Sequence, residues 1–354
     1  MSREQANPAA LIGGLANVLW EEYWHLICHR SELPIHGDFV KFEVGDDEVV
    51  VFNDHGELVA FDNRCPHRGA RIFEAEAGNQ SATCQYHGWT FSNGKMIVPR
   101  PEEFSRCDLS RVELRRWQTA WIGDFLFVGK QPLQSIDEQL SQTRNILEDL
   151  SFGIDGRVDF NAYKFECDWP IAIENALEPY HVAMIHPQSL GKLDLEEGEN
   201  SFFGRNSVWY SRLGNQRMAK QLESLKRFFN LDYQFEGYMS LYLFPFTMLS
   251  STYGYSYSLQ SFYPSSQTGS TNFSSRLLKM ALRPGLEKTA MDSFFASTAN
   301  VNRRVFDEDN RICKRVPSDS WSLNPPLFFA DSESKVLHFR QSCREALIVH
   351  GADE

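Results

Sequence analysis

Two short stretches of the sequence each carry one cysteine and one histidine. The first holds Cys65 and His67, separated by one residue, and the second holds Cys84 and His87, separated by two. Two thiolates and two imidazoles form a four-ligand set for a soft or borderline metal. Zinc would accept these ligands, and so would a 2Fe-2S centre in which two histidines replace two cysteines on one iron.

The spacing of the four ligands separates these two alternatives. A Cys2His2 zinc finger keeps its two cysteines together and its two histidines together along the chain. Here each stretch supplies one ligand of each type, which lets both sulfurs hold one iron and both imidazoles hold the other. Gly69 and Gly88 follow the histidines and suit backbone that passes close to a cluster.

At these positions the sequence resembles the Rieske family. The match covers ligand type, spacing and flanking residues in two boxes, Cys65-x-His67-Arg68-Gly69 and Cys84-x-x-His87-Gly88-Trp89. The resemblance implies that Cys65 and Cys84 bind the inner iron of a 2Fe-2S cluster and that His67 and His87 bind the outer one. Hydrogen-bond donors to the sulfurs and burial would set the reduction potential.

A second group of ionisable residues lies in the otherwise apolar segment 169–187. Glu174 and Glu178 precede His181 and His186, which stand five residues apart. Burying so many ionisable groups is costly unless they pair or bind something. Two neutral imidazoles and one carboxylate on one side of an iron form the facial triad of non-haem Fe(II) oxygenases, which leaves positions open for O₂.

With this segment the resemblance narrows to the catalytic α-subunits of Rieske non-haem iron oxygenases, which include ring-hydroxylating dioxygenases and Rieske monooxygenases. Asn175, Glu178, His181 and His186 match the family spacing. The resemblance implies that the two histidines bind a mononuclear iron. It also implies that Asn175 lies beside this iron, and that Tyr180 lines the site.

The third iron ligand must come from far along the chain. In the family it is a carboxylate on a late helix, and the matching segment here is Phe306–Ile312. Asp309 is the preferred candidate and Asp307 is the alternative. Either acid could instead be a solvated helix acid.

Glu178 departs from the commonest family pattern, which has Asp at this position. In the family this acid bridges a cluster histidine of one subunit to an iron-ligand histidine of its neighbour, so the resemblance implies electron transfer through Glu178 and a head-to-tail trimer. A branch that acts on quaternary ammonium compounds also carries Glu, although Pro179 here replaces its usual Cys. The alternative role for Glu178 is that of a helix-start acid.

The chain is long enough for two domains at 354 residues. We expect an α+β protein with an N-terminal helical segment at 1–36 that packs on the catalytic domain. A small antiparallel β domain with the cluster loops should follow at 37–131, and a helix-on-antiparallel-sheet (helix-grip) catalytic domain at 132–354. Helices are predicted at 219–229, 284–300 and 333–347, and two long strands at 238–249 and 252–263.

Charge and composition limit the partners. The net charge of −12 argues against nucleic acid and against an anionic membrane surface. No signal peptide or membrane-length apolar run is evident, and the five cysteines outside the cluster boxes are typical of a reduced, cytoplasmic protein. The sequence contains no flavin or nicotinamide fingerprint, so electrons should come from a separate reductase, with or without a ferredoxin.

The expected function is that of a terminal oxygenase component. It would use O₂ and these electrons to hydroxylate or demethylate a small aromatic or quaternary-ammonium substrate. The substrate pocket is predicted to lie under the sheet near Phe244, Phe246, Met248, Tyr253, Tyr255 and Phe262. Aromatic rings there would suit an apolar small molecule or a quaternary ammonium. Two alternatives stay open: a cis-dihydroxylating aromatic ring dioxygenase, and an electron-transfer Rieske protein without a catalytic iron.

Overall fold

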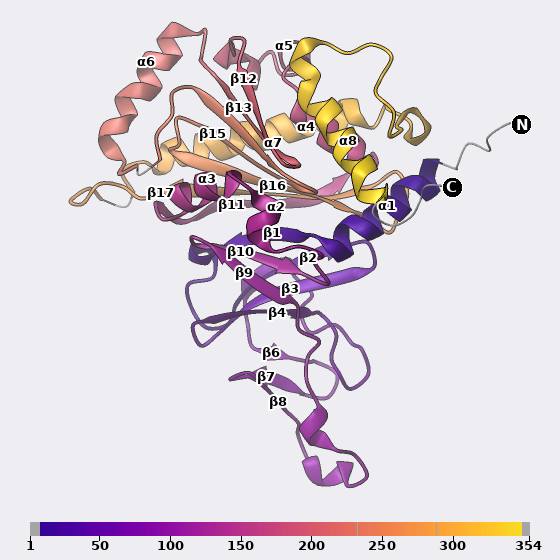
Figure 1. Cartoon of the computed structure of the whole chain (residues 1–354). Coiled ribbons are helices and arrows are strands. Elements are labelled where there is room, and N and C mark those ends of the chain that lie inside the picture. The colour runs from indigo at the N-terminus through magenta and orange to yellow at the C-terminus, as the bar shows by residue number, and fades with distance from the viewer. Residues whose placement is uncertain (1–7, 232, 288, 349–354) are drawn as a thin grey trace, which may run out of the picture.

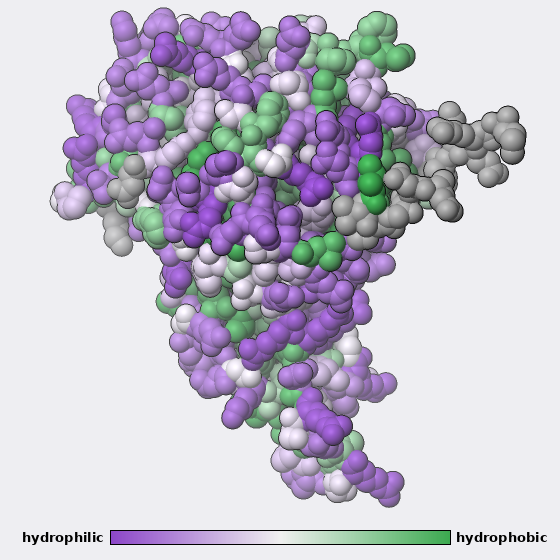
Figure 2. Space-filling view, in the orientation of Figure 1, coloured by the Kyte–Doolittle hydropathy of each residue, from purple (hydrophilic) through white to green (hydrophobic). Residues whose placement is uncertain are grey.

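The computed structural model describes residues 8–231, 233–287 and 289–348. Figure 1 shows a broad upper part built on a large sheet and a narrow lower part built from short strands. The space-filling view in Figure 2 shows the same taper, with a mainly hydrophilic face on which hydrophobic residues form small separate groups. No helix among the described residues is long and apolar enough to cross a membrane.

The chain begins with helix α1 (Pro8–Glu22), followed by strand β1 (Trp24–His29). Leu15 and Leu19 of α1 are fully buried in a core that also contains Phe339 of α8 (Ser334–Ile348). β1 pairs with β10 (Phe125–Gly129), which pairs with β9 (Gln118–Ile122), so the N-terminal segment joins a three-stranded sheet.

The lower part carries the two Cys–His loops. A four-stranded sheet has the order β4-β3-β2-β5 and consists of β2 (Asp38–Val44), β3 (Asp47–Asp54), β4 (Glu57–Asp62) and β5 (Ala77–Asn79). A small three-stranded sheet follows, with β6 (Ala82–Thr83), β7 (Thr90–Ser92) and β8 (Lys95–Ile97). These hairpins agree with the alternating pattern and turn residues of the sequence.

The upper part is organised by a seven-stranded antiparallel sheet in the order β11-β17-β16-β15-β14-β13-β12. Its strands are β11 (Ile154–Phe165), β12 (Glu199–Phe203), β13 (Asn206–Ser211), β14 (Tyr238–Leu243), β15 (Thr247–Thr252), β16 (Ser256–Pro264) and β17 (Thr271–Met280). Helices α2 (Ile136–Leu140) and α3 (Thr143–Ser151) connect the lower part to β11.

Helices pack on one face of this seven-stranded sheet. They are α4 (Trp169–Leu177), α5 (Val182–Ile185), α6 (Gln216–Leu225) and the long α7 (Asp292–Cys313). Figure 1 shows α7 running across the sheet, with α4 and α5 near its far end. Short 3-10 turns lie at η1 (Arg30–Glu32), η2 (Pro101–Phe104), η3 (Leu109–Arg111), η4 (Leu190–Leu193), η5 (Lys226–Phe228), η6 (Ser318–Ser320) and η7 (Asp331–Glu333).

This arrangement confirms the predicted α+β class, with a small antiparallel β domain and helices packed on one antiparallel sheet. The domain limits 1–36, 37–131 and 132–354 stay a prediction.

Two details of the sequence-based elements were wrong. The predicted strand 238–249 is a hairpin of β14 and β15, because Pro245 lacks the N–H that a continuous strand would need there. The predicted helix 284–300 instead spans Asp292–Cys313, since Pro284 and Gly285 lie in a turn before it. The predicted helices 219–229 and 333–347 correspond to α6 and α8.

Candidate metal centres

The two Cys–His loops have matching backbone geometry. In the first loop the Gly69 N–H donates to the Cys65 carbonyl at 2.9 Å, and in the second the Gly88 N–H donates to the Cys84 carbonyl at 2.9 Å. Gly69 and Gly88 both have φ of +74°, a left-handed conformation that glycine adopts without strain. The two loops are therefore equivalent supports that present their side chains to each other.

The four side chains converge between these loops. Cys65 and Cys84 are buried, and burial together with the neighbouring Cys84 thiol raises the pKa of the Cys65 thiol. The imidazoles of His67 and His87 lie with ring centroids 4.6 Å apart. His67 Nδ1 is buried and has no hydrogen-bond partner among the described atoms, which suits an atom that binds metal. The donor set and this orphaned nitrogen fit a 2Fe-2S cluster.

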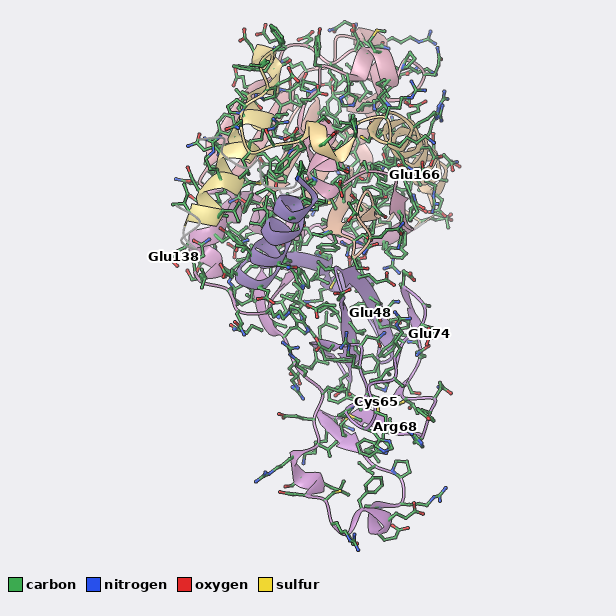
Figure 3. The ribbon with its side chains drawn as sticks, turned by 90° about the vertical axis from the view of Figure 1, so that its right-hand side faces the viewer. Glu48, Cys65, Arg68, Glu74, Glu138 and Glu166 are labelled. Carbon is green, nitrogen blue, oxygen red and sulfur yellow. The ribbon has the colours of Figure 1, made fainter. Side chains whose placement is uncertain are left out.

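Aromatic side chains support the two histidines. Trp89 stacks on His67 with centroids 4.8 Å apart, and the exposed Tyr86 stacks on His87 at 4.0 Å. Figure 3 shows Cys65 and Arg68 in the narrow lower part, well separated from Glu166 in the upper part. The cluster loops therefore lie at a part of the molecule that another protein can approach.

The second site lies where α4, α5 and α7 meet. Glu178 follows the last residue of α4 and precedes Pro179, which favours the extended backbone seen at Glu178 (φ −117°, ψ 142°). The chain then turns into the short helix α5, so that His181 and His186 flank it and point their Nε2 atoms at each other, 3.2 Å apart.

Asp309 of α7 completes this group. Its Oδ1 lies 2.9 Å from His186 Nε2 and 3.5 Å from His181 Nε2. Ligands that meet a metal at right angles, each with an ordinary metal–ligand bond, are separated by about 3 Å. The three atoms therefore stand as one face of an octahedral site would require, and the two-histidine, one-carboxylate donor set fits non-haem Fe(II).

Asp307 does not join this group. It is exposed, whereas Asp309 is 8 % exposed, because two residues on a helix point to nearly opposite sides. Of the two candidates from the sequence, only Asp309 is brought to the histidines.

The electrostatics of the triad favour a bound cation. Burial opposes the charged form of His181, but Asp309 and Glu178 outweigh it and raise the pKa of the imidazole to about 9. Burial likewise opposes the charge on Asp309, but contact with His181 and His186 lowers the pKa of its carboxyl. Negative charge concentrated around two imidazoles is the surrounding that a divalent metal ion prefers.

Hydrogen bonds orient all three side chains of the triad. Asn175 Nδ2 donates to Asp309 Oδ1 at 2.9 Å, and the Oε1 of Glu178 lies 2.7 Å from His181 Nδ1. Glu178 Oε2 also accepts the backbone N–H of His181 at 3.1 Å, so Glu178 has the geometry of a helix-start acid as well. Fixing the far nitrogen of a ligand histidine sets its tautomer and leaves Nε2 for metal.

Glu308 fixes the Nδ1 side of the His186 ring, as Glu178 does for His181. This role of Glu308 was not predicted from the sequence. Its Oε2 lies 2.9 Å from His186 Nδ1 and accepts from Ser189 Oγ at 2.5 Å. Its Oε1 accepts from Arg304 Nε at 2.9 Å. The only signal in the sequence was the acidic run that contains Asp309.

Replacing Glu308 with glutamine should weaken metal binding at the triad. The variant keeps the size of the side chain but removes the negative charge that makes His186 a better ligand. We expect the affinity for Fe(II) to fall about 10- to 100-fold, measured by iron titration of metal-stripped protein. The cluster absorbance should stay unchanged, and Asp307→Asn on the exposed side of α7 is the control. Equal affinities in the two variants would contradict this role.

Two other residues singled out in this segment lie away from the triad. Tyr180 is 71 % exposed and does not line the hollow next to the triad, so its predicted place in the site was wrong. Glu174 forms a two-pronged ion pair with Arg340 at 2.6 and 2.7 Å and accepts from Trp321. This ion pair balances the buried charge of Glu174, which is one of the two acids that precede the histidines.

Two adjoining hollows lie beside the triad, between α7 and the sheet. The smaller one, about 70 Å³, is lined by the triad together with Ser240 and Met248. The larger one is about 430 Å³ and shares Tyr238, Gln260 and Phe306 with the smaller one. A volume of this order accommodates a small organic ligand.

Of the six residues predicted near the pocket, Met248 lines the smaller hollow, and the prediction was wrong for the five aromatic ones. Phe244, Phe246 and Phe262 pack in one apolar core, and Tyr255 packs in another with Tyr253 at its edge. Phe262 lies on the same side of β16 as Gln260 but farther along the strand, where it packs against Phe165 and Phe273 instead of lining the hollow. On β15 and β16 the side that faces the hollows carries Ser250, Ser258 and Gln260.

Lys335, near the start of α8, contacts Ser240, which lines the smaller hollow. It is 2 % exposed, and its Nζ donates to the Ser240 carbonyl at 3.2 Å and to Ser240 Oγ at 3.3 Å. No acidic side chain among the described residues forms an ion pair with it. Burial lowers the pKa of this amine from 10.5 to about 7.

This shift predicts a pH dependence of stability. Between pH 7 and 10.5 the unfolded chain binds a proton at Lys335 that the folded chain does not, so folded-state stability should rise with pH across this window. The contribution amounts to at most about 5 kcal/mol. The difference in thermal midpoint between wild type and Lys335→Met should therefore be largest at pH 7, with the variant more stable, and should shrink toward pH 10. A constant difference would contradict a lowered pKa.

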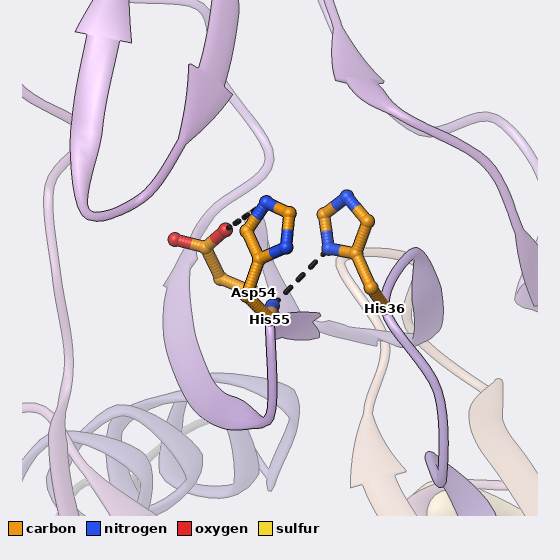
Figure 4. A group of neighbouring side chains, drawn as sticks. All are labelled: His36, Asp54 and His55. Atoms are coloured by element: carbon orange, nitrogen blue, oxygen red, sulfur yellow. Dashed lines mark hydrogen bonds and ion pairs between the residues drawn. The ribbon is translucent and has the colours of Figure 1, made fainter.

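A third cluster of possible ligands, in the lower part, does not form a metal site (Figure 4). The imidazoles of His36 and His55 are stacked, with centroids 3.7 Å apart and planes 11° apart. Their in-plane lone pairs run parallel and cannot converge on one ion. The Asp54 carboxylate accepts the backbone N–H groups of Asn93 and Gly94, so it supports the adjacent hairpin.

Comparison with known proteins agrees with both parts of the structure. Residues 23–107 match the Rieske [2Fe-2S] domain, and residues 155–348 match the catalytic domain of the ring hydroxylating alpha subunit. The second match alone covers more than half of the chain. The protein belongs to the ring-hydroxylating oxygenase alpha-subunit family, which confirms the resemblance inferred from the sequence. Its cofactors are those of this family, a Rieske 2Fe-2S cluster and a mononuclear non-haem iron.

Individual relatives are distant. The chain is 31 % identical to the anthranilate 1,2-dioxygenase large subunit of Acinetobacter baylyi over 56 % of this chain and 45 % of the relative. It is 28 % identical to the glycine betaine monooxygenase oxygenase subunit of Chromohalobacter salexigens over 49 % of this chain and 40 % of the relative. The matched region thus spans less than half the length of these curated relatives.

Solved structures show the same fold. A quaternary ammonium Rieske monooxygenase in complex with L-carnitine superimposes with a TM-score of 0.72 at 17 % identity, covering 96 % of this chain and 92 % of the other. Naphthalene 1,2-dioxygenase from Rhodococcus sp. bound to indole gives a TM-score of 0.71 at 20 % identity, covering 97 % and 94 %.

Proposed function

We propose that this chain is the terminal oxygenase component of a multicomponent Rieske oxygenase. The observation that carries the proposal is the placement of the His181, His186 and Asp309 ligand atoms 2.9–3.5 Å apart beside the hollow under α7. When bound, the mononuclear iron activates O₂ for insertion into an organic substrate, and the cluster supplies stored electrons. A separate reductase, with or without a ferredoxin, is the electron donor.

The protein residues have distinct tasks in this proposal. Cys65, Cys84, His67 and His87 hold the cluster, and His181, His186 and Asp309 hold the mononuclear iron. Glu178 accepts the Nδ1 proton of His181 and keeps that ring in place. Asn175 Nδ2 donates to the Asp309 carboxylate and holds it in place, and the apolar side of α7 keeps bulk water from the substrate.

Electron transfer between the two centres is proposed to cross a subunit boundary in a cyclic homotrimer. The cluster loops lie in the narrow lower part of the chain, far from α4, α5 and α7 (Figures 1 and 3). The exposed Tyr86 beside His87 and the exposed Tyr180 and Met184 near Glu178 are side chains that such a contact would cover. Glu178 would then link the neighbour's cluster histidine to His181.

The reaction is proposed to be hydroxylation or demethylation of a small molecule. Glu178 supports a monooxygenase of the kind that acts on quaternary ammonium compounds, and glycine betaine and carnitine monooxygenase subunits are among the relatives. The higher identity to anthranilate and toluate 1,2-dioxygenase subunits favours ring dioxygenation as the second candidate.

An electron-transfer protein without a catalytic iron is the alternative from another class. Iron content separates the two, since the oxygenase holds one mononuclear iron besides the two irons of the cluster. The test is metal analysis of the purified protein, followed by O₂ uptake with a surrogate reductase and a panel of candidate substrates. Two irons per chain and no substrate-stimulated O₂ uptake would support the carrier instead.

A further inference from the structure

The charge around the two hollows is uneven. Among the described residues that line the larger hollow, Lys192 is the only one with a formal charge, and none is acidic. The acids that line the smaller hollow, Glu178 and Asp309, are engaged with the triad histidines. Apart from the metal site, the space beside the triad is therefore free of negative charge.

The sheet side of the larger hollow is lined by connected hydrogen-bonding groups. Gln260 Nε2 donates to Ser250 Oγ at 3.2 Å and to Ser258 Oγ at 3.3 Å. Each serine oxygen accepts in these bonds, so its own O–H stays a donor. All three side chains are at most 7 % exposed. Buried donors of this kind need an acceptor, and a ligand oxygen can supply it.

The buried amine of Lys335 contacts another serine, Ser240, on the same side of the sheet. Lys335 donates to Ser240 Oγ, and Ser240 lines the smaller hollow beside the triad. The Ser240 hydroxyl hydrogen is left with only a long contact to Met248 Sδ at 3.6 Å. Lys335 lies in the first turn of α8, where the helix dipole disfavours a cation. Burial and the dipole both make this amine costly, unless an anion comes close to it.

We propose that the substrate of this site carries a carboxylate, which Ser240 binds with Lys335 behind it, while its apolar body lies against α7. The inference rests on the proposed oxygenase function of the triad. Ser250 and Ser258 supply further donors to oxygen atoms of the substrate. Val305 and Phe306, which line both hollows from α7, face the apolar body.

The same surroundings disfavour a cationic head group at this position. A cation buried close to Ser240 would need an acid to balance its charge. The acids that line the smaller hollow, Glu178 and Asp309, are engaged with the triad histidines, and the described lining of the larger hollow adds none. A cation would also approach the Lys335 amine.

Binding to the holoenzyme tests this inference with matched probes. Benzoate, benzamide and phenyltrimethylammonium share one ring and differ in charge, and 3-phenylpropanoate with its amide forms a longer pair. By calorimetry we expect each acid to bind at least about tenfold more tightly than its amide, a difference of about 1.4 kcal/mol, and the cation not to bind. Absence of this preference in both pairs overturns the proposal.

Three variants test where the carboxylate of the probe acids binds. Lys335→Met and Ser240→Ala should each weaken acid binding at least about tenfold and leave amide binding unchanged. Lys164→Met removes an exposed lysine that does not line the hollows and should change neither. Thermal melts confirm that the variants fold, and Lys335→Met should not lower the midpoint at pH 7. Acid binding that is unchanged in both Lys335→Met and Ser240→Ala also overturns the proposal.

Iron analysis of the same samples keeps this inference separate from the proposed function. If the mononuclear iron is present and the acids show no preference, the carboxylate inference alone fails. If that iron is absent from correctly loaded protein, the oxygenase function fails whatever the probes do.

Discussion

Asp309→Ala should abolish oxygenation while leaving the cluster intact. The change removes the only carboxylate of the triad. The two remaining imidazoles, whose Nε2 atoms lie 3.2 Å apart, cannot hold Fe(II) in a site built for three ligands. We expect the iron content to fall by one atom per chain, and substrate oxidation to fall at least about a thousandfold, equivalent to about 4 kcal/mol. The visible absorbance of the cluster should not change.

Asp307→Ala is the matched control for this variant. It removes the same side chain from the same helix two residues earlier, but on the exposed face of α7. We expect wild-type iron content and activity. If instead Asp307→Ala lost the iron and Asp309→Ala kept it, the assignment of the third ligand would be reversed.

The cluster ligands and the two iron histidines could be predicted from the sequence because each group is local. Cys65 and His67, or His181 and His186, are held by a few consecutive residues, so their spacing along the chain already fixes their geometry. The resemblance to a family then supplied the role of each box. Asp309 was harder to place, because only the packing of α7 against α4 and α5 selects it over Asp307.

The pocket lining could not be predicted in the same way. Met248 and Ser250 share one face of β15, and Ser258, Gln260 and Phe262 share one face of β16. The sequence does not say which part of that side packs against helices and which part stays open as a hollow. The rings lie in the apolar cores and Ser250, Ser258 and Gln260 face the hollow. Lys335 was equally hidden, since its contact with Ser240 joins residues 95 positions apart.

Mixing two inactive variants should restore activity if electrons cross between subunits. Cys84→Ala removes the cluster but keeps the triad, and Asp309→Ala keeps the cluster but removes the iron. In a cyclic trimer the cluster of each subunit delivers electrons to the mononuclear iron of the next. An interface between two subunits is therefore active when the electron-donating subunit is Asp309→Ala and the accepting subunit is Cys84→Ala. Random assembly from equal amounts of the two variants makes about a quarter of all interfaces active.

We therefore expect co-expressed or co-refolded mixtures to reach about a quarter of wild-type activity, whereas each variant alone stays inactive. Adding Glu178→Gln to the Cys84→Ala acceptor should remove most of this recovery, because the carboxylate that links the neighbour's cluster to His181 belongs to the acceptor subunit. The same substitution in the Asp309→Ala donor should have no effect. Recovery that depended equally on Glu178 in both subunits, or no recovery in mixed trimers that contain both metal centres, would contradict transfer across the boundary. The iron content of the acceptor separates a relay role for Glu178 from a structural one. An acceptor that keeps its mononuclear iron but loses the recovery has lost the relay, whereas an acceptor that also loses this iron has lost the support of His181.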